Sequence, residues 1–473
     1  MIFSSPLFLF LFFPILLLVY YLTPNKIKNY ILLIFSLFFY SWGEPRFIFV
    51  VVVSIAADYF IARQLPRCEK KIRKWWLLFS IFINVGVLLY AKYANFFVEN
   101  LNELYQLLGL TPFQWSAVAL PVGISFLTFQ KISYVVDVYR EEVPPQRKLS
   151  DLLLYILMFP QLVAGPIVRY KEIASQLTDR QAGDTYSNRV AGFSRFIVGL
   201  AKKLLIANVL AEQVDIIFAL SPEYFSTGTA WIAIIAYTFQ IYFDFSGYSD
   251  MALGMGKMLG FRFPENFNFP YISQSITEFW RRWHITLSSW MKDYLYIPLG
   301  GNRVPLPRIY FNLATVFFIS GFWHGAAWTF IFWGLYHGFF LILEKMFLLK
   351  FLKKIGKFPA VVITFLIVII GWVFFRSDSI DYAFRFIGKL FSFDFSMDEF
   401  YFDARFLTFL GLAVLFSFMG YFKKIENFQY QIFGENPKRL LLIGGFVVSV
   451  ILYVICGGVL LSGGLNPFIY FRF

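Results

Sequence analysis

The side chains best suited to chemistry in this sequence are its three histidines, which all lie in one region. They are His284, His324 and His337, within residues 264–338. An imidazole accepts and returns a proton near neutral pH, so each histidine is a candidate general acid or base. Ionisable groups are costly in an apolar, membrane-like chain and mark functional sites there. We therefore expect a reactive centre within 264–338.

His324 stands between two apolar segments. The first, 309–323, spans about 22 Å as a helix, which is short for a membrane core of roughly 30 Å. The second restarts near Ala327. This spacing places the imidazole inside the bilayer at a helix break, where a reaction centre would be useful. A structural histidine bonded between helices, or a proton relay in a transporter, would fit the same pattern.

The other two histidines carry weaker signals. His284 lies in a stretch rich in Trp and Arg, which by itself favours an interfacial anchor over a catalyst. His337 follows His324 by thirteen residues, which is about 220° around an α-helix. Two residues so placed do not face one site on a single straight helix. We therefore expect a structural role for His337.

Charged residues near the histidines suggest contacts with anions. Arg281, Arg282 and Lys292 suit the phosphates of a donor molecule, and equally suit lipid headgroups. Asp244 and Asp250 flank the sequence FSGYS, where short polar side chains are typical caps of helix ends. We expect the two aspartates to be caps.

The C-terminal sequence SGGLNPFIYFRF is unusual. Gly463, Gly464 and Pro467 break the preceding apolar segment, and an aromatic hexapeptide, 468–473, follows. An aromatic belt at the membrane interface would explain it. Tyr470 is, however, also a hydroxyl nucleophile flanked by apolar residues that would dock it in a cavity.

The composition identifies the kind of protein that must position these residues. The chain has 473 residues, of which 59% are hydrophobic and 15% charged, whereas soluble domains carry about 25% charged residues. It is expected to be an all-α polytopic membrane protein. Its net charge of +13 suits anionic lipids or a polyanionic cofactor such as coenzyme A, and we expect no nucleic-acid partner. Cys68 and Cys456 lie far apart without a CxxC or Cys/His cluster, so we expect neither a disulfide nor a metal.

Apolar runs predict about 11–12 transmembrane helices in a single membrane domain, 1–473. The candidate crossings are 5–22, 29–42, 47–62, 75–95, 119–138, 196–220, 229–246, 309–323, 327–344, 359–375, 405–421 and 439–461.

Basic residues predict the orientation of these crossings. Lys and Arg concentrate in 24–28, 63–74, 345–357 and 422–438, while the intervening loops are poor in them. Cytoplasmic loops carry the excess of Lys and Arg, so both termini are expected outside the cytoplasm.

Two segments do not fit simple crossings. Segment 151–168 lies between basic loops and contains Pro160, Gly165 and Pro166, which favours a re-entrant excursion that lines a cavity. Region 247–308 mixes aromatic and basic residues, which is typical of interfacial helices with aromatic rings in lipid. Its aromatic residues include Trp280, Trp283, Trp290, Tyr294 and Tyr296.

Five motifs together resemble the membrane-bound O-acyltransferase family, in its bacterial branch that includes alginate and peptidoglycan O-acetyltransferases and teichoic acid D-alanyltransferase. Their combination within 121–338 is highly specific, although each alone is weak. The motifs are PVGISFLTFQKISYVVDVYR (121–140), FPQLVAGPIVRY (159–170), DFSGYSDMALGMGK (244–257), EFWRRWHITLSSWMKDYLYIPLGGNR (278–303) and GFWHGAAWTFIFWGLYHG (321–338).

The resemblance implies a fold and site residues. The family fold is a ring of helices with a funnel from each face, meeting near a histidine. His324, in FWHG, matches that invariant histidine, and His284, in WRRWH, matches a second characteristic position. The hexapeptide 468–473 resembles a C-terminal motif whose tyrosine is thought to carry the acyl group, and that tyrosine is Tyr470 here. The donor implied is acetyl-CoA, with no metal, held near Arg281, Arg282, Trp283 and Lys292.

The resemblance also implies a reaction and partners. An acetyl group would pass from cytoplasmic acetyl-CoA across the bacterial inner membrane, and an extracytoplasmic SGNH-type protein would complete O-acetylation of a polysaccharide. Transfer of D-alanine or another acyl group from a carrier protein is the alternative within the family. A non-enzymatic, proton-coupled transporter or flippase is the alternative from another class, and the absence of inverted repeats disfavours it.

Overall fold

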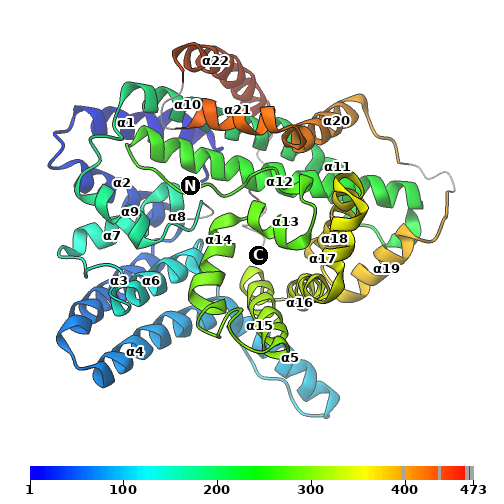
Figure 1. Ribbon diagram of the computed structural model, residues 1–473, viewed down its shortest axis with the longest axis horizontal. Coiled ribbons are helices and arrows are strands. Elements are labelled where there is room, and N and C mark those ends of the chain that lie inside the picture. Colours follow the sequence, from blue (N-terminus) through cyan, green and yellow to red (C-terminus); the bar gives the residue numbers. More distant parts are fainter. Residues whose placement is uncertain (163–164, 396–399, 435–437, 464–467, 469–473) are drawn as a thin grey trace. The chain divides into compact units, whose positions relative to one another are not determined.

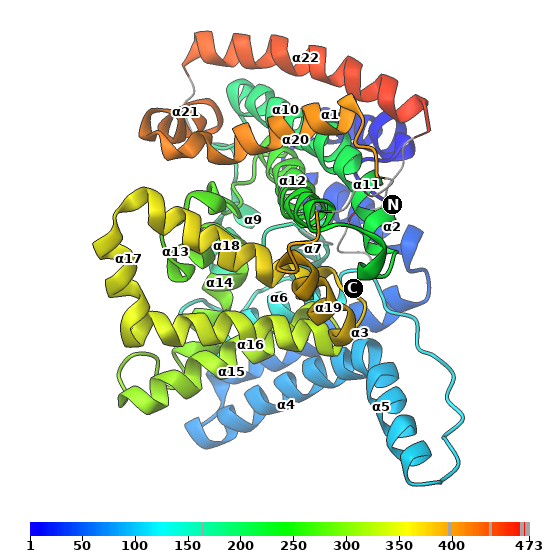
Figure 2. The same ribbon diagram turned by 90° about the vertical axis from the view of Figure 1, so that its right-hand side faces the viewer.

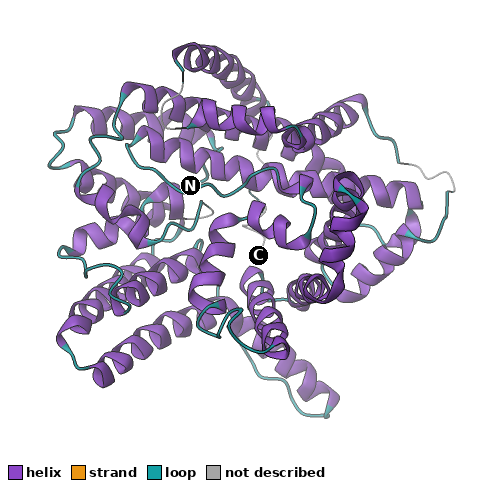
Figure 3. Ribbon diagram, viewed as in Figure 1, coloured by secondary structure: helices purple, strands orange, loops and turns teal. Residues whose placement is uncertain are grey.

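The computed structural model describes residues 1–162, 165–395, 400–434, 438–463 and Phe468 (Figure 1). They form two compact units. Unit 1 comprises Met1–Asp184 and Gly260–Phe263, and unit 2 comprises Thr185–Leu259 and Pro264–Phe473. The regular structure of the described residues is helical throughout, with no strand among them (Figure 3). The expectation of an all-helical fold is confirmed, whereas a single domain over 1–473 stays a prediction.

Unit 1 contains the helices of the N-terminal part of the chain. They are α1 Phe13–Leu22, α2 Lys28–Gly43, α3 Phe47–Gln64, α4 Lys70–Leu88, α5 Ala94–Leu107, α6 Ile124–Tyr139, α7 Leu149–Leu157, α8 Phe159–Leu162 and α9 Tyr170–Thr178.

Unit 2 contains the remaining helices. They are α10 Tyr186–Ala201, α11 Asn208–Phe218, α12 Thr227–Met258, α13 Ile276–Arg282, α14 Ile285–Met291, α15 Leu306–His324, α16 Trp328–Leu343, α17 Leu349–Ile355, α18 Lys357–Arg376, α19 Ile380–Leu390, α20 Ala404–Phe418, α21 Lys423–Phe433 and α22 Arg439–Leu461.

The apolar segments of the sequence coincide with helices. Segment 151–168 is interrupted at Met158, between α7 and α8, and Pro160 lies inside α8; the re-entrant excursion predicted for it stays a prediction. Five described stretches are long and apolar enough to cross a membrane: Phe47–Arg67, Lys70–Leu107, Lys357–Arg376, Ala404–Tyr421 and Arg439–Leu461. The larger count of 11–12 crossings stays a prediction.

Helix α12 packs closely against α10 through facing glycines. A Cβ at Gly192 would lie 2.7 Å from the carbonyl oxygen of Gly254, and one at Gly247 would lie 2.7 Å from that of Gly199. Both distances are too short for real side chains. Small residues allow such close approach of membrane helices, which explains the glycines of the sequence DFSGYSDMALGMGK.

Ion pairs join α12 to α10 and to the π-helical segment Lys202–Ala207 that follows it, which corrects the prediction for Asp244 and Asp250. Helix α12 continues through both aspartates, so neither caps a helix end. Asp244 pairs with Lys203 at 2.6 Å, and Asp250 pairs with Lys202 at 2.6 Å and Arg195 at 2.9 Å. These cations allow the carboxylates to lie inside a continuous helix.

The tryptophans of 247–308 lie in protein, so the prediction of rings in lipid is wrong for them. Trp280, Trp283 and Trp290 are only 7%, 2% and 7% exposed. The ring centroid of Trp280 lies 5.6 Å from that of Trp333 on α16, and Trp283 lies 4.9 Å from Trp372 on α18. The short helices α13 and α14 carry these rings into the core of unit 2. Figure 2 shows α16 lying between α15 and α18.

Candidate active site

His324 is the last residue of α15, as the sequence predicted, and α16 begins four residues later. Helix α15 has 19 residues, longer than the predicted 15-residue segment. The imidazole is 4% exposed and is surrounded by aromatic rings. Its centroid lies 4.9 Å from that of Trp323, 5.0 Å from Trp333 and 5.4 Å from Phe375. The helix break therefore holds the imidazole inside unit 2.

Three glycines allow the close packing around His324. A Cβ at Gly334 would collide with the carbonyl oxygen of Phe317, and one at Gly325 would collide with the ring of Phe330. A Cβ at Gly321 would lie 3.1 Å from the Cα of Gly334. Helices α15 and α16 thus approach closely enough for Trp333 to reach the imidazole.

His284 caps the N-terminus of α14, with its backbone in the left-handed region at φ 45°. A non-glycine residue there is uncommon and marks a site that its surroundings hold in place. The Nδ1 atom accepts a hydrogen bond from the backbone N–H of Leu287 at 3.3 Å. Burial lowers the pKa of His284 to about 3. The ring is therefore neutral at pH 7, with its proton on Nε2, and is suited to donate a hydrogen bond.

Aromatic contacts join the three histidines in one cluster. The rings of His284 and Trp323 lie 6.2 Å apart, and Trp323 also contacts His324. Trp333 contacts His324 and, at 5.2 Å, His337. Three histidines spread over residues 284–337 thus meet in the core of unit 2.

His337 is completely buried on α16. Within the described part of the chain, neither ring nitrogen has a hydrogen-bond partner. Its ring lies 5.1 Å from Trp280 and 6.3 Å from Phe279, both on α13. A Cβ at Gly371 of α18 would lie 2.8 Å from its Nε2. His337 therefore lies where α13, α16 and α18 meet, and a structural role stays a prediction.

The four residues predicted to bind the donor are separated by the structure. Arg281 and Lys292 line one 180 Å³ pocket, together with Trp280. The pocket also reaches Ser320 on α15, one helical turn before His324.

Arg282 and Trp283 lie elsewhere. The guanidinium of Arg282 binds Glu278 at 2.9 Å and Glu426 at 3.0 Å, so it links α13 to α21. Trp283 is a core residue that contacts Trp372. Only the first pair therefore remains suited to a donor.

Glu344 is a supporting residue that the sequence did not reveal. Its carboxylate accepts hydrogen bonds from the backbone N–H of Ile276, the backbone N–H of Thr277 at 3.0 Å and the hydroxyl of Thr277 at 2.6 Å. These groups form the N-terminus of α13, where a negative charge is favourable. Glu344 thereby fixes the helix that carries Trp280 and Arg281. The only signal in the sequence was an acidic residue directly after a long apolar run.

The C-terminal motif begins beside this cluster. Phe468 is 1% exposed and stacks on Tyr248 at 4.7 Å. It also lies 5.9 Å from Phe245, whose ring is 4.7 Å from that of His284. Tyr470 falls outside the described residues. Among the described residues, no group of three or more His, Cys, Asp or Glu side chains could hold a metal ion.

Comparison with known proteins shows the family of this chain. Residues 140–375 match the model of the membrane-bound O-acyltransferase family. The probable alginate O-acetylase AlgI of Pseudomonas aeruginosa is 45% identical over 395 residues, covering 83% of this chain and 75% of that protein. The peptidoglycan O-acetyltransferase of Helicobacter pylori is 38% identical, covering 81% of this chain and 79% of that protein.

A third relative is named for the transfer of D-alanine and not of an acetyl group. The teichoic acid D-alanyltransferase of Bacillus subtilis is 30% identical, covering 54% of this chain and 68% of that protein. High identity over most of both chains, together with the apolar helices, places this protein in a family of multi-pass membrane enzymes. The chain belongs to the membrane-bound O-acyltransferase family and is an O-acyltransferase.

Proposed function

We propose that this enzyme moves an acetyl group from cytoplasmic acetyl-CoA across the membrane for O-acetylation of an extracytoplasmic polysaccharide, such as alginate or peptidoglycan. The observation that carries the proposal is the position of His324. It is buried at a helix break and joined through Trp323 to the second histidine, His284. The names of the relatives with 45% and 38% identity favour acetyl as the group transferred.

The donor enters through the pocket lined by Arg281 and Lys292. Both side chains lie toward solvent, where they are suited to the phosphates of coenzyme A. The rest of the lining is largely apolar, which suits the pantetheine arm and the acetyl group. Because Ser320 lies one turn from His324, a thioester that passes this residue approaches the imidazole.

His324 acts as the general base. It takes the proton from a hydroxyl group, the oxygen attacks the thioester carbonyl, and the C–S bond breaks. The coenzyme A thiolate then takes that proton from the imidazolium. A phenol has a pKa near 10, so an attacking tyrosine needs such a base at neutral pH. His284, neutral and protonated on Nε2, is suited to donate a hydrogen bond to the oxyanion.

Tyr470 is the proposed first acceptor. Phe468 packs against Phe245, which in turn contacts His284. Tyr470 follows Phe468 by two residues in the motif 468–473, which is why we propose it as the acceptor. The acetyl-tyrosine would then pass its acetyl group to the serine of an SGNH-type partner, which regenerates the phenol and acetylates the polysaccharide.

The proposed orientation of the chain in the membrane is consistent with transfer of the acetyl group from the cytoplasm to the outside. The positive-inside rule, applied to the basic loops, favours a donor pocket on the cytoplasmic side of the inner membrane and both termini outside. Tyr470 would then lie on the side where the polysaccharide is. Coenzyme A remains in the cytoplasm, and only the acetyl group crosses.

Two variants test the proposal. Purified protein is incubated with radiolabelled acetyl-CoA, and covalently bound label is measured. His324→Ala should reduce labelling by a factor of about 100 or more, the usual contribution of a general base. Tyr470→Phe deletes only the phenolic oxygen and should abolish labelling. Label that persists on Tyr470→Phe would exclude Tyr470 as the carrier.

Donor identity is tested with the same protein. If purified enzyme transfers nothing from acetyl-CoA but accepts D-alanine from a carrier protein, the acetyl donor is excluded. The 30% identity to a D-alanyltransferase makes this the comparison to perform. Full surface acetylation in cells that carry folded His324→Ala would exclude its catalytic role.

A further inference from the structure

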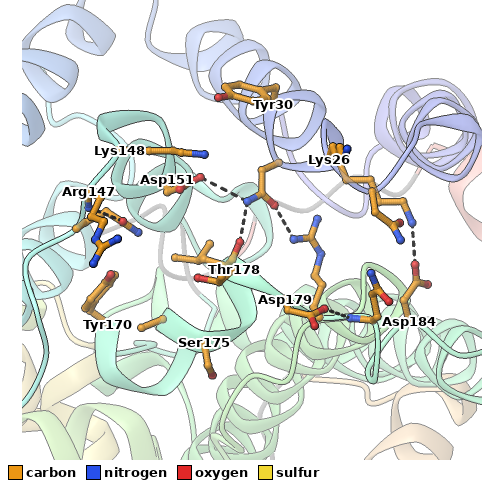
Figure 4. A pocket seen from close by; sticks show the side chains of 18 of the residues that line it. Lys26, Tyr30, Arg147, Lys148, Asp151, Tyr170, Ser175, Thr178, Asp179 and Asp184 are labelled. Atoms are coloured by element: carbon orange, nitrogen blue, oxygen red, sulfur yellow. Dashed lines mark hydrogen bonds and ion pairs between the residues drawn. The ribbon is translucent and has the colours of Figure 1, made fainter.

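Unit 1 contains a second pocket, which the proposed reaction does not use. Its volume is 640 Å³, within the range of about 300–1,000 Å³ that is usual for small-molecule sites. Residues from the start of α2, the loop before α7, and α9 with the turn after it line the pocket (Figure 4). The lining is strongly charged, unlike the apolar pocket beside Trp280.

The charge of this pocket is positive. Five cationic side chains and three carboxylates line it, which leaves a net charge of +2. The carboxylate of Asp184 is neutralised by Lys28 at 2.8 Å. The charged groups of Lys26, Arg147 and Lys148 form no ion pair within the described part of unit 1, and Figure 4 shows Lys148 and Arg147 on one side and Lys26 on the other. The five cations are Lys26, Lys28, Arg147, Lys148 and Arg180, and the carboxylates are Asp151, Asp179 and Asp184.

Arg180 gives the pocket a rigid centre. Its Nε donates to the hydroxyl of Tyr20 at 3.0 Å, and its Nη1 donates to Oδ1 of Asn29 at 2.5 Å. The guanidinium also lies 4.5 Å from the ring centroid of Phe261. Its Nη2 is buried and has no hydrogen-bond partner among the described residues. Arg180 is half-buried and lines the pocket, so its guanidinium is a fixed positive charge there, which is suited to an oxyanion.

We propose that this pocket binds the phosphate headgroup of an anionic membrane lipid. Exposed apolar side chains lie beside the pocket where α1 ends and α2 begins: Leu22 is 77% exposed, and Ile27 and Tyr30 are each 46% exposed. Leu22 ends the apolar helix Phe8–Leu22. Apolar groups beside a cationic pocket at a helix end provide for acyl chains and headgroup together, which a soluble phosphate compound would not need.

The loops of the pocket support the same assignment. The sequence places 24–28 and the basic residues near 147 on the cytoplasmic side, where anionic lipids attract basic protein segments. A lipid bound there would link α2, the loop before α7 and the turn after α9, and would stabilise unit 1.

The test is native mass spectrometry of the full-length protein in detergent, titrated with phosphatidylglycerol and, separately, phosphatidylcholine. The triple variant Lys26→Gln/Arg147→Gln/Lys148→Gln removes the three cations of the pocket that form no ion pair in the described part of unit 1. The matched control, Arg67→Gln/Lys71→Gln/Lys74→Gln, removes the same charge from exposed residues outside the pocket. Each basic group near an anionic headgroup contributes roughly a factor of five in affinity.

The expected result is specific loss of one phosphatidylglycerol site. The pocket variant should bind phosphatidylglycerol at least about 10-fold more weakly, whereas the control binds as the unmodified protein does. Equal loss in both variants, or none in the pocket variant, would overturn the proposal. Inorganic phosphate and ADP are added as competitors. If either displaces phosphatidylglycerol at equal concentration, the pocket binds soluble phosphates and the lipid assignment is wrong.

Discussion

The imidazole of His324 meets the indole of Trp333 edge to face, with their ring centroids 5.0 Å apart. The same indole contacts His337 at 5.2 Å. Trp333 therefore separates a histidine at the helix break from one in the middle of α16. The two imidazoles differ in position, because His324 ends α15 at the helix break whereas His337 lies within the continuous helix α16. Residues of the proposed donor pocket lie one turn from each, Ser320 from His324 and Leu341 from His337.

His337→Gln should retain most of the activity. We expect labelling from acetyl-CoA within about 10-fold of the unmodified protein, whereas loss of a general base at His324 costs about 100-fold or more. The thermal midpoint should fall, because Gln fits the aromatic surroundings of His337 poorly. Equal loss of activity in folded His337→Gln and His324→Ala would show that His337 shares in the chemistry.

Gly334→Ala should disable the enzyme by moving α16. The added methyl group collides with the carbonyl oxygen of Phe317, so the contact between Trp333 and His324 cannot be kept. The matched control is Gly411→Ala on α20, where a Cβ meets nothing within 4 Å. Activity per folded molecule should fall more than about 10-fold in the first variant and stay unchanged in the second. An active Gly334→Ala enzyme would refute the role of close packing.

Much of the helical layout follows from hydropathy. The predicted crossing 439–461 coincides with α22, and 327–344 differs from α16 by one residue at each end. Apolar runs predict helices well because a buried or lipid-facing backbone must satisfy its own hydrogen bonds. The predicted crossing 229–246 ended too early. In the sequence, Asp244 and Asp250 resemble residues that end a helix, and only the structure shows the cations that pair with them.

The site was predictable only in part. The break after His324 was predictable from the glycine that comes next and the restart of the apolar pattern near Ala327, whereas the predicted shortness of the segment was wrong, since α15 begins at Leu306. Hydropathy cannot tell a ring in lipid from a ring in protein, so the burial of Trp283 was missed. Arg281 and Arg282 are adjacent in sequence, yet Arg281 lines the pocket beside Trp280 and Arg282 binds Glu426. The roles of these two arginines can be told apart only from the residues on distant helices that each one contacts.

Lys203→Met should destabilise the protein strongly. The pair between Lys203 and Asp244 is buried, with side chains 5% and 3% exposed. Removal of one partner leaves an uncompensated charge and costs about 3–5 kcal/mol. The double variant Lys203→Met/Asp244→Leu removes both charges and should recover most of this loss. Thermal unfolding in detergent measures both, and a double variant no more stable than the single one would contradict the argument.

Arg281→Gln/Lys292→Gln should weaken donor binding without changing the chemical step. We expect KM for acetyl-CoA to rise about 5- to 30-fold at constant kcat, because each exposed cation contributes up to about 1 kcal/mol to an ion pair. Lys350→Gln/Lys353→Gln, which lies outside this pocket, controls for the general loss of charge. Arg282→Gln should instead lower stability, since Arg282 links Glu278 and Glu426. An unchanged KM would exclude this pocket as the donor site.

Because His284 is buried in its neutral form, the free energy of unfolding should fall in mild acid. Burial lowers its pKa from the ordinary 6.5 to about 3, so the unfolded chain takes up a proton first as pH falls. Stability from the neutral imidazole is complete above pH 6.5 and declines below it, by about 2 kcal/mol at pH 5. His284→Asn does not titrate, tolerates the left-handed backbone and can accept the bond from Leu287. Chemical unfolding at pH 7 and pH 5 should show a loss about 2 kcal/mol smaller in this variant. Equal losses in the two proteins would mean that His284 is accessible to protons in the folded enzyme.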